Sequence, residues 1–198
     1  MKRILVIFTM LLVAAAVYAA PQAVRGQESA YDIDYWIVSV KGGLSYPLGE
    51  FGEYVNPLFN AGVSGRKGLD MEFSVGGGLH YASMPYVHED APGPFTATIF
   101  DVHGAWQPYM PDLFIWPYLK AGLGMYVMEY SRQVDQYNAE HASETAIGFL
   151  AGIGANYPIG DMFAANIEIL YHHVALAGGT GDLNTFLSAD IGATIYLK

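Results

Sequence analysis

The sequence predicts an all-β protein: an eight-stranded antiparallel up-and-down transmembrane β-barrel, preceded by a cleaved helical signal peptide. Three observations support this prediction. Apolar residues alternate with polar residues or glycine in eight segments of about ten residues. The connections between these segments alternate between short and long. Charged residues make up only 14% of the chain, against about a quarter in a soluble domain, which indicates that something other than water covers much of the surface.

Residues 1–20 are typical of a secretory signal peptide. A basic pair precedes an apolar stretch over residues 4–17, and small residues follow it. The apolar stretch is short for a membrane-spanning helix. We therefore expect residues 21–33 to form an N-terminal periplasmic segment and residues 34–198 to form the barrel domain.

The composition of the exported chain excludes several classes of protein. Without the signal peptide, 7 basic residues face 19 acidic ones, a net charge of about −12. Binding of nucleic acid requires clustered Lys and Arg, so nucleic acid is not expected as a partner. The chain has no cysteine, which excludes disulfides, a thiolate metal site and a lipid attached to an N-terminal cysteine.

The eight predicted strands follow one another through residues 35–46, 58–67, 69–81, 95–107, 114–130, 145–157, 162–174 and 185–197. The second, fourth and sixth connections are tight ("KGLD", "PYMPD" and "YPIGDM"). The other four are long ("PLGEFGEYVNP", "ASMPYVHEDAPGP", "SRQVDQYNAEHASE" and "ALAGGTGDLN"). This alternation is typical of a meander whose two ends face different surroundings, with the short turns on the periplasmic side. Pairing of the last strand with the first would leave no exposed edge.

Each strand has an uncharged apolar face and a face that carries nearly all the strand charges and many glycines. A soluble periplasmic ligand-binding barrel would place the apolar face inside. The glycines favour the opposite arrangement, because the interior of an eight-stranded barrel has little room for side chains. Aromatic residues near the strand ends are typical of the girdles at the two lipid interfaces: Trp36, Tyr46, Tyr81, Trp106, Trp116, Tyr157 and Tyr171. We therefore predict that the apolar face meets lipid.

The inward face is expected to form an ionic network of Lys41, Arg66, Asp70, Glu72, Asp101, Lys120, Glu168 and Asp190. These charges must pair, because an unpaired buried charge costs several kcal/mol, and paired they would close the lumen. The alternative is a narrow channel, in which five acids against three bases would favour cations. We expect no cofactor and no metal site, with the inward histidines (His80, His103 and His172) satisfied by lumen carboxylates.

Five stretches carry a resemblance to a known family: "VSVKGGLSYPLGEFGEY", "MEFSVGGGLHY", "PYLKAGLGMY", "AIGFLAGIGANYPIGDMFAANIEILYHH" and "DIGATIYL". They resemble the small eight-stranded outer membrane β-barrels of OmpA and OmpX type, over most of the chain from Tyr35 onward. The family's C-terminal assembly signal is matched by Asp190, Gly192, Ile195 and Leu197. The family usually ends on an aromatic residue, whereas here Lys198 follows Leu197.

The resemblance implies a location in the outer membrane, contact with its lipids, and recognition by the barrel-assembly machinery and periplasmic chaperones. We expect a monomer with a non-enzymatic structural or surface-interaction role, carried by long acidic extracellular loops. The alternative is a relative of the lipid A-modifying enzymes, because "YHHVALAGG" is similar to the His-x-Ser region of outer membrane lipid A deacylases. Ala175, two places after His173, stands where the serine nucleophile is required, and without that hydroxyl no acyl-enzyme forms.

Overall fold

The protein is an eight-stranded antiparallel β-barrel, as the sequence predicts. The computed structural model describes residues 35–87, 93–110, 113–133, 139–160, 162–175 and 184–197. The strands are β1 (Trp36–Leu48), β2 (Leu58–Gly68), β3 (Phe73–Met84), β4 (Phe95–Trp106), β5 (Trp116–Gln133), β6 (Ala139–Pro158), β7 (Phe163–Ala175) and β8 (Asn184–Leu197). The predicted signal peptide, the segment 21–33 and Lys198 lie outside the described residues.

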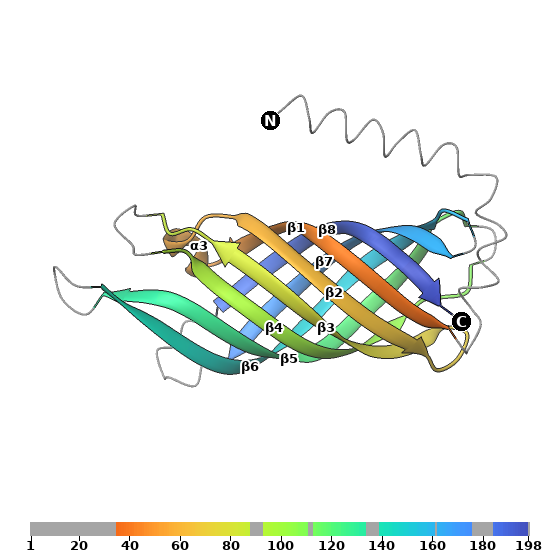
Figure 1. Ribbon diagram of the computed structural model, residues 1–198, viewed down its shortest axis with the longest axis horizontal. Coiled ribbons are helices and arrows are strands. Elements are labelled where there is room, and N and C mark those ends of the chain that lie inside the picture. Colours follow the sequence, from red (N-terminus) through yellow and green to blue (C-terminus); the bar gives the residue numbers. More distant parts are fainter. Residues whose placement is uncertain are drawn as a thin grey trace, which may run out of the picture.

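Each strand pairs with its neighbours in the chain, and β1 pairs with β8 to close the barrel. The closing register runs from Trp36 opposite Leu197 to Leu48 opposite Thr185. Figure 1 shows the strands tilted around the cylinder, with the short helix α3 (Phe51–Tyr54) at one end and the C-terminal end of β8 at the other. We call these the loop end and the turn end. Within the described ranges, no helix is long and apolar enough to cross a membrane.

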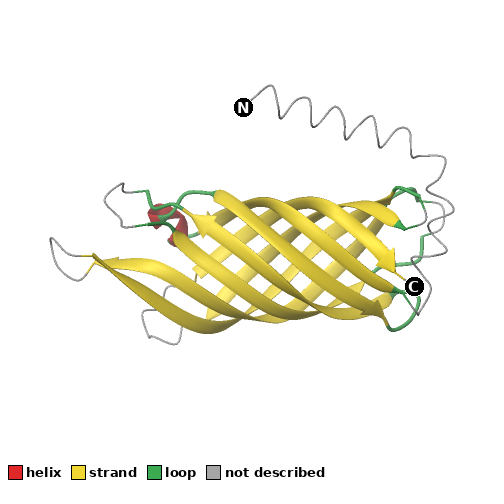
Figure 2. Cartoon of the chain, in the orientation of Figure 1, coloured by secondary structure: helices red, strands yellow, loops and turns green. Residues whose placement is uncertain are grey.

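The strand boundaries differ most from the prediction in β3 and in the β5–β6 hairpin. β3 begins at Phe73 and not at residue 69, because residues 69–72 form the turn from β2. β5 and β6 pair from Trp116 opposite Asn156 to Gln133 opposite Ala139. Their hairpin therefore extends past the other strands at the loop end, as Figure 2 shows.

The apolar face points outward, as predicted. Exposed side chains on this outer wall include Val40, Val102 and Ile147, with 60%, 67% and 70% of their surface accessible. Along the same strands Lys41, Asp101 and Gly148 are buried. A soluble barrel would need the apolar set inside, so that alternative is wrong.

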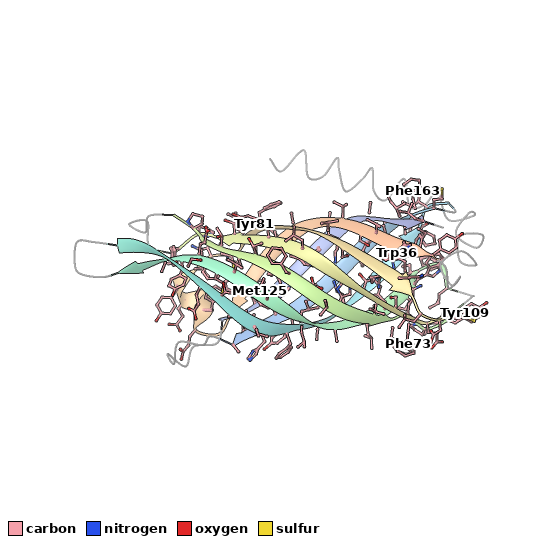
Figure 3. The ribbon with its side chains drawn as sticks, turned by 60° about the horizontal axis from the view of Figure 1, so that its bottom comes forward. Trp36, Phe73, Tyr81, Tyr109, Met125 and Phe163 are labelled. Atoms are coloured by element: carbon pink, nitrogen blue, oxygen red, sulfur yellow. The ribbon has the colours of Figure 1, made fainter. Side chains whose placement is uncertain are left out.

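Aromatic side chains surround the turn end of the outer wall. Figure 3 shows Trp36, Phe73, Tyr109 and Phe163 together at this end, and each is about half exposed. Trp116 does not belong to this girdle, contrary to the prediction. It shares the inward parity of Tyr118 and is only 1% exposed.

Helix α3 covers part of the loop end. Its Phe51 packs edge-on against Phe95, with ring centroids 5.0 Å apart. The chain after the helix is tied to the β3–β4 connection by backbone hydrogen bonds: Asn56 N–H donates to Pro85 C=O (2.7 Å), and Val87 N–H donates to Tyr54 C=O (2.9 Å). The first two long connections therefore pack against each other.

Candidate functional site

The candidate site is the lumen, the interior of the barrel, whose side chains form three layers. An apolar layer lies at the loop end, an ionic layer in the middle and an aromatic layer at the turn end. The order follows from position along the strands: on β7, Val174 belongs to the apolar layer, Glu168 to the ionic layer and Ala164 to the aromatic layer. This alternation of chemistry along the barrel axis determines what the lumen can conduct or bind.

Glu168 is the centre of the ionic layer. Its Oε1 pairs with the Lys41 ammonium and lies 3.7 Å from Lys120 Nζ. All three side chains are at least 95% buried. One carboxylate therefore neutralises charge from two lysines on opposite sides of the lumen, β1 and β5.

Tyr118 links the rest of the layer to Glu168. Its hydroxyl donates to Glu168 Oε2 (2.7 Å) and accepts a hydrogen bond from Asn166 Nδ2 (3.0 Å). The Arg66 guanidinium lies over its ring, with Cζ 4.9 Å from the centroid, a cation–π arrangement. Opposite the ring, a side chain at Gly154 would collide with Tyr118. This glycine on the lumen face therefore makes room for a large neighbour.

Asp101 lies between two histidines. His103 Nδ1 is within hydrogen-bonding reach of one carboxylate oxygen, and His80 Nε2 lies 3.1 Å from the other. His103 is thus hydrogen-bonded to a lumen carboxylate as expected, whereas His80 only approaches one, because its Nε2 makes no hydrogen bond among the described residues. Among the described residues, no group of three or more His, Asp or Glu is arranged to hold a metal ion.

The third inward histidine has a different environment. His172 Nδ1 contacts Tyr126 Oη (3.1 Å), and its Nε2 contacts Ser188 Oγ (3.0 Å). Its ring also stacks on Phe186 at 4.4 Å. His172 therefore joins the ionic layer to the apolar layer, and its partners are hydroxyls rather than a carboxylate.

Asp190 is buried on the loop-end side of the ionic layer. Its Oδ1 has no hydrogen-bond partner among the described residues. It lines a cavity of about 10 Å³ together with Ser45, Asn60 and His80. A cavity of roughly 10–15 Å³ is the least that admits one water molecule, so the space here is water-sized at most.

Asp70 and Glu72, which the sequence predicts to be in the ionic network, lie instead in the turn between β2 and β3. Asp70 Oδ1 accepts hydrogen bonds from the backbone N–H groups of Glu72 (2.8 Å) and Phe73 (2.7 Å). The Glu72 carboxylate accepts from Trp106 Nε1 (2.9 Å). The prediction failed because alternation continues through the turn, where an Asp side chain caps the backbone.

This correction changes the charge balance of the lumen. The buried charged side chains in the described part of the chain, histidines apart, are Lys41, Arg66 and Lys120 against Asp101, Glu168 and Asp190. Three bases face three acids. The negative excess that would favour cations in a channel is therefore absent from this layer.

The loop-end apolar layer did not emerge from the sequence. It contains Val55, Ala82, Met84, Phe95, Ala97, Ile99, Tyr126, Met128, Ala146, Val174 and Phe186. Most of these residues follow the inward parity of their strands beyond the last charged position. Tracing that parity to each strand end would have found the layer; the entry of Val55 from the first connection has no signal in strand parity.

The turn end is filled by Ile37, Trp116, Ala164 and Tyr196. The Trp116 and Tyr196 rings meet edge to face at 6.0 Å. Above them, Asn166 Nδ2 donates to Asn156 Oδ1 (2.8 Å), and Ser39 pairs with Thr194 through their hydroxyls (2.9 Å). Bulky side chains therefore occupy the lumen at both ends of the ionic layer.

The residues of the predicted assembly signal lie along β8 on both faces. Asp190 and Gly192 point inward, whereas Ile195 and Leu197 point outward. A Cβ at Gly192 would lie 2.9 Å from Lys41 Cα and 3.0 Å from its Cγ. Gly192 thus has a packing reason to be glycine, separate from any role in assembly.

Comparison with known proteins gives a family match and several similar folds. The family model described as "Outer membrane protein beta-barrel domain" matches residues 9–192. A search of curated protein sequences gives no match. Among solved structures, the chain resembles Neisserial surface protein A at 11% identity, over 82% of this chain and 96% of that chain, with a TM-score of 0.55. It resembles Ail of Yersinia pestis at 15% identity (84% and 100% covered, TM-score 0.54). It also resembles OprG from Pseudomonas aeruginosa at 10% identity (85% and 98% covered, TM-score 0.55). These structural likenesses concern the fold.

Proposed function

This chain belongs to the outer membrane protein beta-barrel domain family, and from that premise we propose that it is a non-enzymatic, surface-interacting barrel with a closed lumen. Its place is the outer membrane, where the apolar outer wall contacts lipid. The proposed role is to hold the long connections of the loop end at the cell surface, where they meet a partner.

The observation that carries this proposal is the filling of the lumen. The ionic layer lies between a buried apolar layer and a buried aromatic layer. A permeating ion would have to displace Trp116 and Tyr196 at one end and Phe95 and Phe186 at the other. It would also have to break the pairs around Glu168, and removing one partner from a buried ion pair costs about 3–5 kcal/mol.

Conductance of the purified protein in planar bilayers tests the closed lumen, with a porin reconstituted in parallel as a positive control. We expect no stable conductance above the bare membrane. A stable open state of porin size would overturn the closed lumen and support the channel alternative. Equal numbers of buried acids and bases give such a channel no electrostatic reason to prefer cations.

The stretch that resembles a deacylase motif favours a packing role over a catalytic one. His173 lies on the outer wall, with its ring tilted against Phe149 (4.8 Å between centroids) and parallel to that of Tyr171 (6.3 Å). The position of the required serine is Ala175. Mass spectrometry of lipid A from cells that produce the protein is expected to show unchanged acyl chains; loss of one chain would revive the enzymatic alternative.

The loop partner is proposed only by its chemistry. Glu50 and Glu53 are exposed at the start of the first long connection, and the whole chain has a net charge of −10. A partner surface with positive charge or bound divalent cations suits such loops. Cell-surface binding assays that compare the unsubstituted protein with a variant whose β5–β6 hairpin is shortened test this role. Normal assembly of the shortened barrel is the control. Equal binding of the two proteins to every partner surface tested would contradict the proposed role.

We further infer that the barrel-assembly machinery and periplasmic chaperones handle the chain during export. The support is the pattern formed on β8 by Asp190, Gly192, Ile195 and Leu197, which lies on the strand that must pair with β1 to close the barrel. Of this pattern, Ile195 and Leu197 point outward, where an assembly factor can reach them before the barrel is surrounded by lipid.

A further inference from the structure

The outer wall over β6, β7 and β8 contains an open apolar recess of about 320 Å³. The outward-pointing side chains that line it are Ile153, Ala155, Ile167, Ile169, Ala189 and Ile191, and the inward-facing Gly154, Glu168 and Asp190 also border it. This volume is far above the roughly 10–15 Å³ that a single water requires. The recess can therefore accommodate a chain of many atoms.

The recess follows from the strand register. Ile153, Ile169 and Ala189 lie side by side in one row across the three strands, and Ala155, Ile167 and Ile191 form the next row. The first row ends in an alanine on β8 (Ala189), and the second ends in an alanine on β6 (Ala155). Because alanine ends at Cβ and isoleucine projects further, the surface is recessed at the alanines and raised at the isoleucine side chains. In the next row towards the turn end, Ala165 and Ala193 extend this shallow region over β7 and β8, and Tyr157 lies beside them on β6.

The position of the recess along the barrel indicates which part of the membrane it faces. Ile167 is four residues after Phe163, the first residue of β7. Phe163 belongs to the aromatic girdle at the turn end (Figure 3). The recess therefore opens into the hydrocarbon region just inside that girdle, in the half of the bilayer next to the short turns.

We propose that the recess binds one acyl chain of a phospholipid from the leaflet on the turn side. All six outward-pointing side chains are hydrocarbon, and the Glu168 and Asp190 side chains that also border the recess are buried in the lumen. The recess therefore recognises the chain and not the headgroup. A flexible acyl chain fills an irregular apolar surface by many small dispersion contacts. The site depends on the outer wall meeting lipid and is independent of whether the lumen conducts.

A second copy of the protein fits the recess less well. A symmetric pair of barrels would place the same patch on both partners, so recess would face recess and leave voids. Lipid tails are as apolar as isoleucine, so no hydrophobic driving force would expel them in favour of such a contact. A single linear chain avoids both problems.

Lipid retained by the folded barrel tests the proposal. The protein is extracted from membranes in mild detergent, and bound lipid is identified by native mass spectrometry. The variants A189L and A155L each fill the recess from one end. The matched control A121L makes the same change at an exposed alanine on the outer wall of β5 that does not line the recess. Heat-modifiable migration on a gel confirms folding of each variant.

We expect the unsubstituted protein and A121L to retain a phospholipid, and A189L and A155L to retain about tenfold less, since the leucine side chains take up space that the acyl chain would occupy. Absence of retained lipid in the unsubstituted protein would overturn the proposal. Equal retention in the recess variants would do so as well. Lipopolysaccharide as the only retained species would place the site in the wrong leaflet, and a dimer abolished by A189L would make a second copy the occupant. Conductance of the same preparations reports separately on the closed lumen.

Discussion

Replacing Glu168 by glutamine should strongly destabilise the barrel. Glutamine keeps the shape of the side chain but leaves the buried Lys41 and Lys120 without their shared negative charge. At 3.7 Å and an effective dielectric constant of about 20, one charge pair is worth roughly 4 kcal/mol before desolvation. Loss of one partner from a buried pair typically costs about 3–5 kcal/mol. We therefore expect the free energy of unfolding to fall by about 4 kcal/mol.

Urea unfolding in lipid vesicles, followed by tryptophan fluorescence, measures this change. The matched control is E129Q, at an exposed carboxylate on β5, which should shift stability by less than about 0.5 kcal/mol. Adding K41M to E168Q removes one of the two buried lysine charges that E168Q leaves unpaired. The double variant should therefore recover part of the lost free energy of unfolding. A value for E168Q as small as that for E129Q would refute the ionic layer as a stabilising feature.

Three further predictions concern packing, the loop-end cap and assembly. G148V should destabilise the barrel by about 1–3 kcal/mol, because an added Cβ would lie 2.8 Å from the buried Tyr126 ring. G65V is the control, because a Cβ at this outer-wall position meets nothing within 4 Å. Equal urea midpoints for the two variants would contradict this prediction. F51A should speed protease cleavage of the first long connection in intact cells, unlike Y54A at a 60% exposed side chain; unchanged cleavage would argue against a packed cap. Deletion of Lys198 should leave membrane insertion intact or improve it, and failed insertion on cell fractionation would show that the assembly signal is misplaced.

The number and order of the strands, and the face on which each residue lies, could be predicted. Each residue in the wall of a membrane barrel points either to lipid or to the lumen, and the two alternate along every strand. Period-two alternation distinguishes Val102 from Asp101 without knowledge of any neighbour, and glycine content identifies the crowded side. The same local rule misplaced Asp70 and Glu72. Their alternation matches that of a strand, and only the end of the β2–β3 pairing at Gly68 opposite Ser74 shows that the chain has already turned.

The contacts inside the lumen could not be predicted, because they depend on which strands face each other across the barrel. Parity brings Lys41, Lys120 and Glu168 to the interior, but the choice of Glu168 as the shared partner depends on tilt and register. Tyr118 carries no charge, so nothing in the sequence marked it as the residue that links Arg66 to Glu168. Trp116 lies at a strand end, where aromatics gather at the lipid interface, but it has the inward parity of β5, and that parity places it in the lumen.

Single-cysteine labelling on β4 tests the central claim most directly, because the chain has no native cysteine. Val102 is 67% exposed on the outer wall, and Ala105 is 3% exposed in the lumen of the same strand. In intact membranes, neither V102C nor A105C should react with a charged, water-soluble maleimide, because one thiol lies in lipid and the other in the closed lumen. Both should react once the barrel is unfolded. Labelling of A105C by the water-soluble reagent would reveal an open lumen, and its labelling of V102C would show that the apolar wall meets water, either of which would contradict the account.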